Sequence, residues 1–147
     1  MLGRWATIIG LSMTPALLAG PSAACAAGIA WHVNVWLLVS IVATASYAEG
    51  ILVTLLAGRL TNAGFVGHWL ERLRTPKAVA LAEKWGTWGG LFLGAAVVGQ
   101  EPILIALRCL GVHSRRIWLP LAFSNLVFSA VYYVIVSEGW DHLSSLF

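Results

Sequence analysis

The chain has 147 residues, of which 59% are hydrophobic and only 10% are charged, with eight tryptophans and a formal net charge of +3. An average soluble domain carries about 25% charged residues, so this composition predicts an all-α integral membrane protein. The scattered basic residues do not favour a nucleic-acid partner. Because Cys25 and Cys109 lack the spacing of a metal site, we also expect no metal and no cofactor.

The first apolar segment, residues 1–30, ends in the run GPSAACAAG. Small residues with A-x-A spacing around Cys25 are typical of a signal-peptidase site, whereas Pro15 and Pro21 interrupt a long helix. The sequence leaves two interpretations open, a cleaved signal peptide and a first transmembrane helix. Residues 31–147 are predicted to form a single membrane domain.

The second apolar segment, residues 33–58, is long enough to cross a membrane and contains Glu49 far from either end. A charged side chain at such depth is costly, which makes Glu49 a candidate functional group. Two placements remain open for Glu49, a kinked single span and a second re-entrant hairpin.

Residues 59–85 form the well-charged region of the chain. Apolar residues recur there at helical spacing, at Phe65, Trp69 and Leu73, which predicts amphipathic helices on a membrane surface. The positive-inside rule places this region in the cytoplasm, together with the basic connection at residues 113–116.

The third apolar segment, residues 87–112, is interrupted in its middle by Gly99, Gln100, Glu101 and Pro102. Since both flanking basic regions are expected on the cytoplasmic side, the segment has to enter and leave the membrane from one side. Two half-helices of about 12 residues reach about 18 Å, which is near the bilayer midplane. We therefore predict a re-entrant helical hairpin that is broken at Gly99–Pro102.

The last segment, residues 117–137, is predicted to be the final transmembrane helix, with Asn125 near its centre. Buried asparagines in such helices more often form interhelical hydrogen bonds than contact a substrate. The sequence thus predicts three to four membrane segments, one of them the re-entrant hairpin.

The run EGILVTL, which starts at Glu49, aligns with the run EPILIAL, which starts at Glu101. The alignment is short and aliphatic residues align easily, but the deep acidic residues of the two segments coincide. Broken segments in corresponding halves are typical of transporters that are built from internal repeats. This pattern favours Glu49 and Glu101 as members of one site.

The order of a basic amphipathic region, the run KWGTWGGLFLGAAVVGQEPILIALRCLGV, a short basic loop and a long last helix resembles the second half of the DedA/VTT superfamily, including the related small multidrug export family. The likeness covers residues 64–137. In that superfamily the loop usually has a Pro-Gly pair followed closely by arginine, whereas Pro102 is followed here by Ile103 and the arginine is Arg108. The resemblance implies a transporter or lipid translocase of the bacterial inner membrane, with undecaprenyl phosphate or phospholipids as substrates and with proton coupling.

The predicted substrate- or proton-binding residues are Glu49, Gln100, Glu101, Pro102, Arg108 and Asn125. Arg108 follows Glu101 by nearly two helical turns, so both side chains lie on one helix face. Arginine suits the attraction of a phosphate because its planar guanidinium binds phosphate with two hydrogen bonds, and a buried carboxylate suits proton coupling. An alternative assigns Glu101 to capping the returning half-helix, with Pro102 at its first position, and Arg108 to reaching the membrane interface.

The sequence contains no nucleophile and base pair and no glycine-rich phosphate loop, so an enzyme is not predicted. A chain of this size is small for enclosing a pathway alone, and the spacing of Gly86, Gly90 and Gly94 suits close helix packing. We therefore expect contacts with membrane lipids and a homo-oligomer. The alternative function is that of a structural or assembly subunit in a larger membrane complex.

Overall fold

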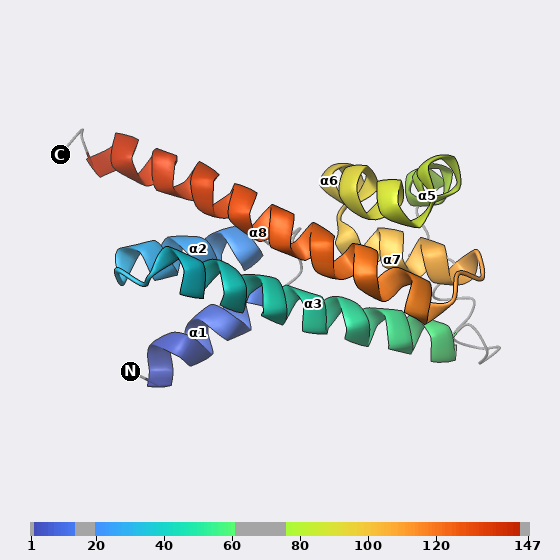
Figure 1. The fold of residues 1–147 in the computed structure, drawn as a ribbon, viewed down its shortest axis with the longest axis horizontal. Coiled ribbons are helices and arrows are strands. Elements are labelled where there is room, and N and C mark those ends of the chain that lie inside the picture. The colour runs from blue at the N-terminus through green and yellow to red at the C-terminus, as the bar shows by residue number, and fades with distance from the viewer. Residues whose placement is uncertain (1, 14–19, 61–75, 145–147) are drawn as a thin grey trace. The chain divides into compact units, whose positions relative to one another are not determined.

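The computed structural model describes residues 2–13, 20–60 and 76–144, and over these ranges the chain is helical without any strand (Figure 1). The chain divides into two compact units. Unit 1 consists of Met1–Tyr47 and Asn125–Phe147, and unit 2 consists of Ala48–Ser124. The two longest helices each contribute to both units. Unit 1 joins two separate stretches of the chain, whereas unit 2 is one continuous stretch.

These two longest helices, α3 (Val35–Leu60) and α8 (Ser114–Ser144), are long and apolar enough to cross a membrane. The start of α3 is fixed by Asn34, whose side-chain oxygen accepts hydrogen bonds from the backbone amides of Trp36 and Leu37 at 3.0 and 3.4 Å. Asparagine is among the best residues for this capping position because helices begin with unpaired amides.

The bounds of these helices refine two predictions. Glu49 lies inside the continuous helix α3, so the structure places it neither at a break nor in a second hairpin. Helix α8 begins at Ser114, before the predicted start at residue 117, and it continues beyond residue 137. Arg115 and Arg116 therefore belong to the first turn of α8 and not to a loop.

In unit 1, the N-terminal residues form two 11-residue helices, α1 (Leu2–Ser12) and α2 (Gly20–Ala30), which pack against each other. A helix of 11 residues is about 16 Å long, roughly half of the hydrocarbon core of a bilayer. The described part of residues 1–30 is thus a pair of short helices and not one spanning helix. Pro21 is the second residue of α2, where its missing amide proton costs no hydrogen bond.

The core of unit 1 joins three helices. Its fully buried residues are Ile8 of α1, Ala24 and Cys25 of α2, and Leu38 and Val42 of α3. Partly buried residues of α8, including Tyr132 and Tyr133, pack against this core. A buried hydrogen bond of 3.2 Å from the Ser46 hydroxyl to the carbonyl of Ser12 ties α3 to the end of α1.

Unit 2 contains α5 (Pro76–Gly89), the π-helix η2 (Gly90–Gly94), α6 (Ala95–Val98) and α7 (Gln100–Cys109). The chain turns sharply at Gly99, whose φ of 92° and ψ of 160° form a combination that is essentially restricted to glycine. After this turn, α7 packs against α5, η2 and α6, and Figure 1 draws it running back beneath them. The chain thus forms a helical hairpin whose turn falls within the predicted break.

Close packing in this hairpin depends on glycine. A Cβ atom at Gly94 would lie 2.7 Å from Cδ1 of Ile103 on α7, so a larger residue there would push the two arms apart. The role of Gly86 is different, because it has a positive φ of 62° and open space around it. The rings of Trp88 on α5 and Phe123 on α8 lie in contact, with their centroids 6.0 Å apart.

The predicted amphipathic region of residues 59–85 is described only in part. Residues 76–85 belong to α5, in which Ala78 and Ala82 are buried while Lys84 is exposed. The apolar stripe at Phe65, Trp69 and Leu73 lies outside the described residues.

A structural repeat relates α2 and α3 to α7 and α8. The ends of α2 at Ala30 and of α7 at Cys109 are 79 positions apart, and so are the starts of α3 at Val35 and of α8 at Ser114. The buried positions follow the same shift. They are Ala24, Cys25, Leu38 and Val42 in the first repeat and Ile103, Leu104, Ile117 and Leu121 in the second.

The turn between the two helices of each repeat has the same hydrogen bonds. In the first repeat, the amides of His32 and Val33 donate to the carbonyls of Ile29 and Gly28, at 2.9 Å in both cases. In the second, the amides of Gly111 and Val112 donate to the carbonyls of Arg108 and Leu107 at 3.1 and 3.0 Å. This pattern is the Schellman motif, which requires a positive φ at one residue, and His32 and Gly111 supply it with 53° and 78°.

This repeat corrects the alignment of the Glu49 and Glu101 runs. In the structure α3 corresponds to α8, and α7 corresponds to α2, so the two runs do not occupy equivalent positions of a repeat. They belong instead to two different helices of unit 2 that contact each other, as described next.

Candidate functional site

The candidate site lies where α3 and α7 meet in unit 2. A Cβ atom at Gly50 of α3 would lie 2.9 Å from Nε2 of Gln100 at the start of α7. Eight residues further along both helices, the guanidinium of Arg108 lies directly against Gly58. Between these two contacts, Ala57 packs with Ile105. The two helices therefore run in the same direction and stay in register over about two turns.

An acidic pair forms the centre of the site. Glu49 precedes Gly50 on α3, Glu101 follows Gln100 on α7, and the two carboxyl groups interact electrostatically. Both side chains are half-buried. The site therefore presents two carboxyl groups from two neighbouring helices.

The start of α7 determines how Glu101 is presented. Gly99 occupies the capping position without a side-chain hydrogen bond, and the helix begins at Gln100. Pro102 is therefore the third helical residue, which corrects the alternative interpretation that placed it first. Glu101 is thus the acidic residue of the first turn of α7, and Arg108 is the basic residue of its last turn.

Arg108 lies away from the acidic pair. Its Nη1 donates a 2.6 Å hydrogen bond to the carbonyl of Val112, and its guanidinium covers Gly58. The side chain thus connects the end of α7, the following turn and α3, which is a structural role. Phosphate binding by Arg108 stays a prediction.

The six predicted residues separate into groups. Glu49, Gln100 and Glu101 come together, while Pro102 shapes the first turn of α7. Asn125 is buried in α8, with 4% of its surface exposed, and it belongs to unit 1, whereas the acidic pair belongs to unit 2.

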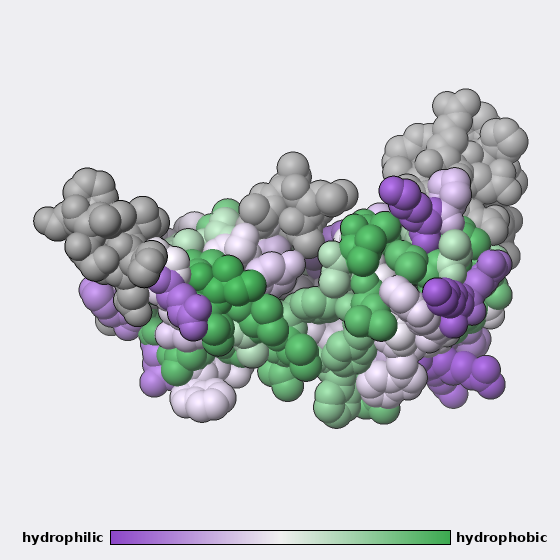
Figure 2. Space-filling model, turned by 90° about the horizontal axis from the view of Figure 1, so that it is seen from above, coloured by the Kyte–Doolittle hydropathy of each residue, from purple (hydrophilic) through white to green (hydrophobic). Residues whose placement is uncertain are grey.

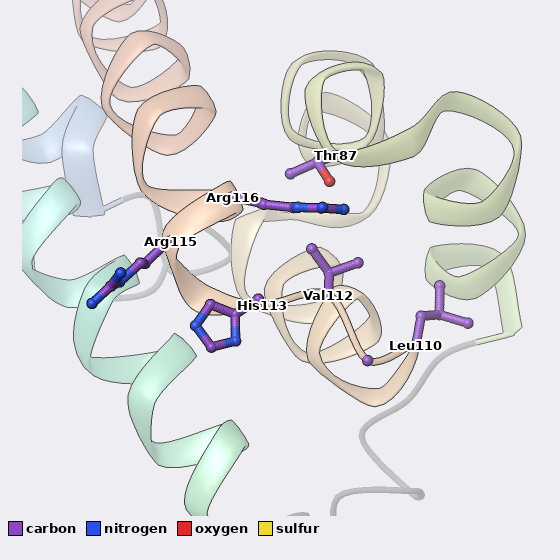
Figure 3. Close-up of a pocket in the computed structure, with 7 residues that line it drawn as sticks. Thr87, Leu110, Val112, His113, Arg115 and Arg116 are labelled. Carbon is purple, nitrogen blue, oxygen red and sulfur yellow. The ribbon is translucent and has the colours of Figure 1, made fainter.

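A second feature of unit 2 is a pocket of about 670 Å³ at the turn between α7 and α8, and the sequence did not predict it. Its lining includes Thr87, Leu110, Val112, His113, Arg115 and Arg116 (Figure 3). On the face drawn in Figure 2, hydrophilic side chains lie at the edge at which Figure 1 draws this turn, and also elsewhere on this face. The run HSRR, residues 113–116, predicted a cytoplasmic connection, and its basic residues are also the signal in the sequence for this pocket.

Within the described ranges, no group of three or more His, Cys, Asp or Glu side chains is arranged to hold a metal ion. Cys25 and Cys109 are free thiols, the first buried and the second half-buried.

No protein-family model, curated protein or solved structure matches this chain. Functional conclusions therefore rest on the geometry of its own residues.

Proposed function

We propose that the protein is a small membrane transporter or lipid translocase that moves a lipid phosphate with proton coupling through Glu49 and Glu101. The observation that carries the proposal is the acidic pair on two neighbouring helices, one of which is long and apolar enough to cross a membrane. The resemblance to the DedA/VTT superfamily and the break at Gly99 agree with it.

The energetic argument starts from the cost of a charge inside a membrane. An acidic side chain near the centre of a bilayer costs at least about 2.5 kcal/mol, so such residues persist mainly where they have a function. Two neighbouring acidic side chains cost more free energy there than one, because two negative charges repel each other. A proton that is bound on one side of the membrane and released on the other accounts for keeping both.

The helical hairpin supplies the second part of the argument. In the proposed topology, α3 and α8 cross the bacterial inner membrane, and the hairpin of α5 to α7 enters from the cytoplasmic side, where residues 59–85 and 113–116 lie. Gly99 then lies near the midplane, beside Gln100 and Glu101. Irregular backbone at that depth is tolerated only inside protein or along a water-filled cavity. A water-filled cavity beside Gly99 would give protons access to the pair.

The test is transport by the full-length protein in proteoliposomes under a pH gradient, with a fluorescent polyprenyl phosphate or phosphatidic acid as substrate. We expect Glu49→Gln and Glu101→Gln each to lower the proton-driven rate at least about tenfold, the lower range of losses seen when a proton-transfer group is removed. Glu83→Gln on the exposed face of α5 is the matched control and should transport like the unaltered chain. Unchanged rates in both site variants contradict the proposal.

The alternative, a structural or assembly subunit, is favoured by one observation. Large apolar side chains on α3 and α8 are exposed, including Trp36 at 79% and Leu119 and Ile135 at 60%, and they can contact partner helices as well as lipid. This function predicts that the purified chain transports neither lipid and that it co-purifies with other membrane proteins in stable stoichiometry.

A further inference from the structure

The basic pocket at the turn between α7 and α8 is not used by the proposed proton transfer. Its volume of about 670 Å³ falls in the range of small-molecule sites, which is about 300–1,000 Å³. One part of its lining is apolar, from Leu110 and Val112, and another part is polar or cationic, from Thr87, His113 and the two arginines. Such a mixed lining suits a ligand with an anionic group and an apolar portion.

The positive charge of this pocket comes from two arginines of α8, and the first turn of α8 has no acidic residue to balance it. Arg115 and Arg116 lie in that turn. The first turn of a helix already carries a partial positive charge, so cations there add to the positive potential. Helix α7 shows the opposite arrangement, with Glu101 in its first turn and Arg108 in its last. A bound anion would offset the charge in the pocket.

The two arginines are not equivalent. Figure 3 shows the side chain of Arg116 extending between Thr87 and Val112, whereas that of Arg115 points to the other side of the helix start. Arg116 and the hydroxyl of Thr87 thus face the same space from two different helices. A guanidinium can bind two phosphate oxygens at once, and a hydroxyl can donate to a third.

The corresponding place in the first repeat provides a comparison. A pocket of about 210 Å³ lies there, and its lining includes Trp31, His32, Asn34 and Leu37. Leu37 occupies the position that Arg116 has in the second repeat. The cation of that pocket, Arg4, lies over the ring of Trp31 at 5.7 Å, so an aromatic ring of the chain itself already engages it. Of these two pockets, the one in the second repeat is thus the larger, and it is lined by two arginines.

We infer that this pocket binds a phosphate group, with Arg116 as the main ligand, Thr87 as a second donor and Arg115 as a weaker electrostatic contribution. The inference deepens the proposed function and rests on it for its biological meaning, because the pocket then holds the substrate's phosphate at the basic end of unit 2. The phosphate can belong to a lipid headgroup or be a free phosphate in water, and the experiment separates these sources.

The experiment measures binding to the purified full-length protein in neutral detergent by isothermal titration calorimetry. The probes are dioctanoyl phosphatidic acid, inorganic phosphate and the phosphate-free dioctanoylglycerol. We expect phosphatidic acid to bind and its affinity to fall at least about tenfold in Arg116→Gln, the loss expected for a charge-assisted hydrogen bond. Arg115→Gln and Thr87→Val should lose less. Arg59→Gln removes an exposed arginine from the last turn of α3 and should bind as the unaltered chain does.

The outcomes are distinct. Binding of inorganic phosphate with the same dependence on Arg116 supports the pocket and identifies water-soluble phosphate as a ligand, whereas binding of phosphatidic acid alone supports it and identifies a lipid headgroup. Equal affinities in Arg116→Gln and Arg59→Gln overturn the inference, as does equally tight binding of dioctanoylglycerol. Circular dichroism of each variant verifies that it is folded.

The same variants separate this inference from the proposed function. Binding that depends on Arg116 in a chain that transports no lipid supports the pocket and rejects the transporter. Transport that depends on Glu49, together with binding that ignores Arg116, rejects the pocket and supports the transporter.

Discussion

The two repeats share their backbone and differ in their chemistry. Both consist of a short helix, a Schellman turn and a long apolar helix, with the same hydrogen bonds in the turn and several matched buried positions. The short helix of the first repeat, α2, buries small residues and carries no charged side chain, whereas α7 buries large aliphatic residues and carries Glu101 and Arg108. Packing of the short helices therefore needs only the apolar pattern. Of the two charged residues of α7, Arg108 connects this helix to α3 and to the following turn, and Glu101 belongs to the candidate site.

The largest effect on stability is expected at the turn that opens the second repeat. Gly99→Ala places a side chain at a φ of 92° and a ψ of 160°, which only glycine adopts readily. We expect a loss of about 3 kcal/mol in the free energy of unfolding, at the upper end of the cost of such strain. Denaturant unfolding followed by circular dichroism measures it, and a loss below that of an ordinary surface substitution would show that the turn can relax.

A smaller effect is expected from packing in the first repeat. A Cβ atom at Gly28 of α2 would lie 2.5 Å from Cδ2 of Leu38, a fully buried side chain. Overfilling a packed core typically costs 1–3 kcal/mol, so we expect about 2 kcal/mol for Gly28→Ala. Gly90→Ala is the matched control, because its nearest atoms lie at 3.6 and 3.7 Å, which is ordinary contact. Similar unfolding free energies for the two variants would contradict the tight contact of α2 and α3.

The smallest effect concerns the residue with positive φ in each turn. His32 is exposed and adopts a left-handed conformation, which costs a residue with a side chain about 1–2 kcal/mol in strain. Gly111 has no such strain, because it lacks a Cβ atom. Glycine loses about 0.5–1 kcal/mol more than other residues in chain entropy on folding, so His32→Gly should stabilise the protein by about 0.5–1 kcal/mol. Gly111→His should destabilise it by a similar amount, since no other group crowds that position. Thermal unfolding of the pair measures both changes, and equal signs would show that the turns are not equivalent.

Local chemistry explains what the sequence predicted well. The helical class follows from the apolar composition, and the break follows from Gly99, because few other residues adopt its backbone conformation. The acidic residues within apolar segments likewise predicted Glu49 and Glu101 as members of one site.

Contacts between distant segments explain what the sequence did not reveal. The repeat has few identical residues at its matched positions, because only backbone bonds and burial are shared. The register that places Arg108 against Gly58 and the pocket between Thr87 and Arg116 depend on how helices pack, which no local pattern specifies.

The central claim is that Glu49 and Glu101 act as one proton-binding unit, and a double-mutant cycle in the transport assay tests it most directly. Glu49→Gln, Glu101→Gln and the double variant are compared with the unaltered chain for proton-driven transfer of a lipid phosphate. Groups that act as a unit are strongly non-additive, so we predict a double variant within about twofold of the more impaired single variant. Losses that multiply would show that the two carboxyl groups act independently and would contradict the shared site.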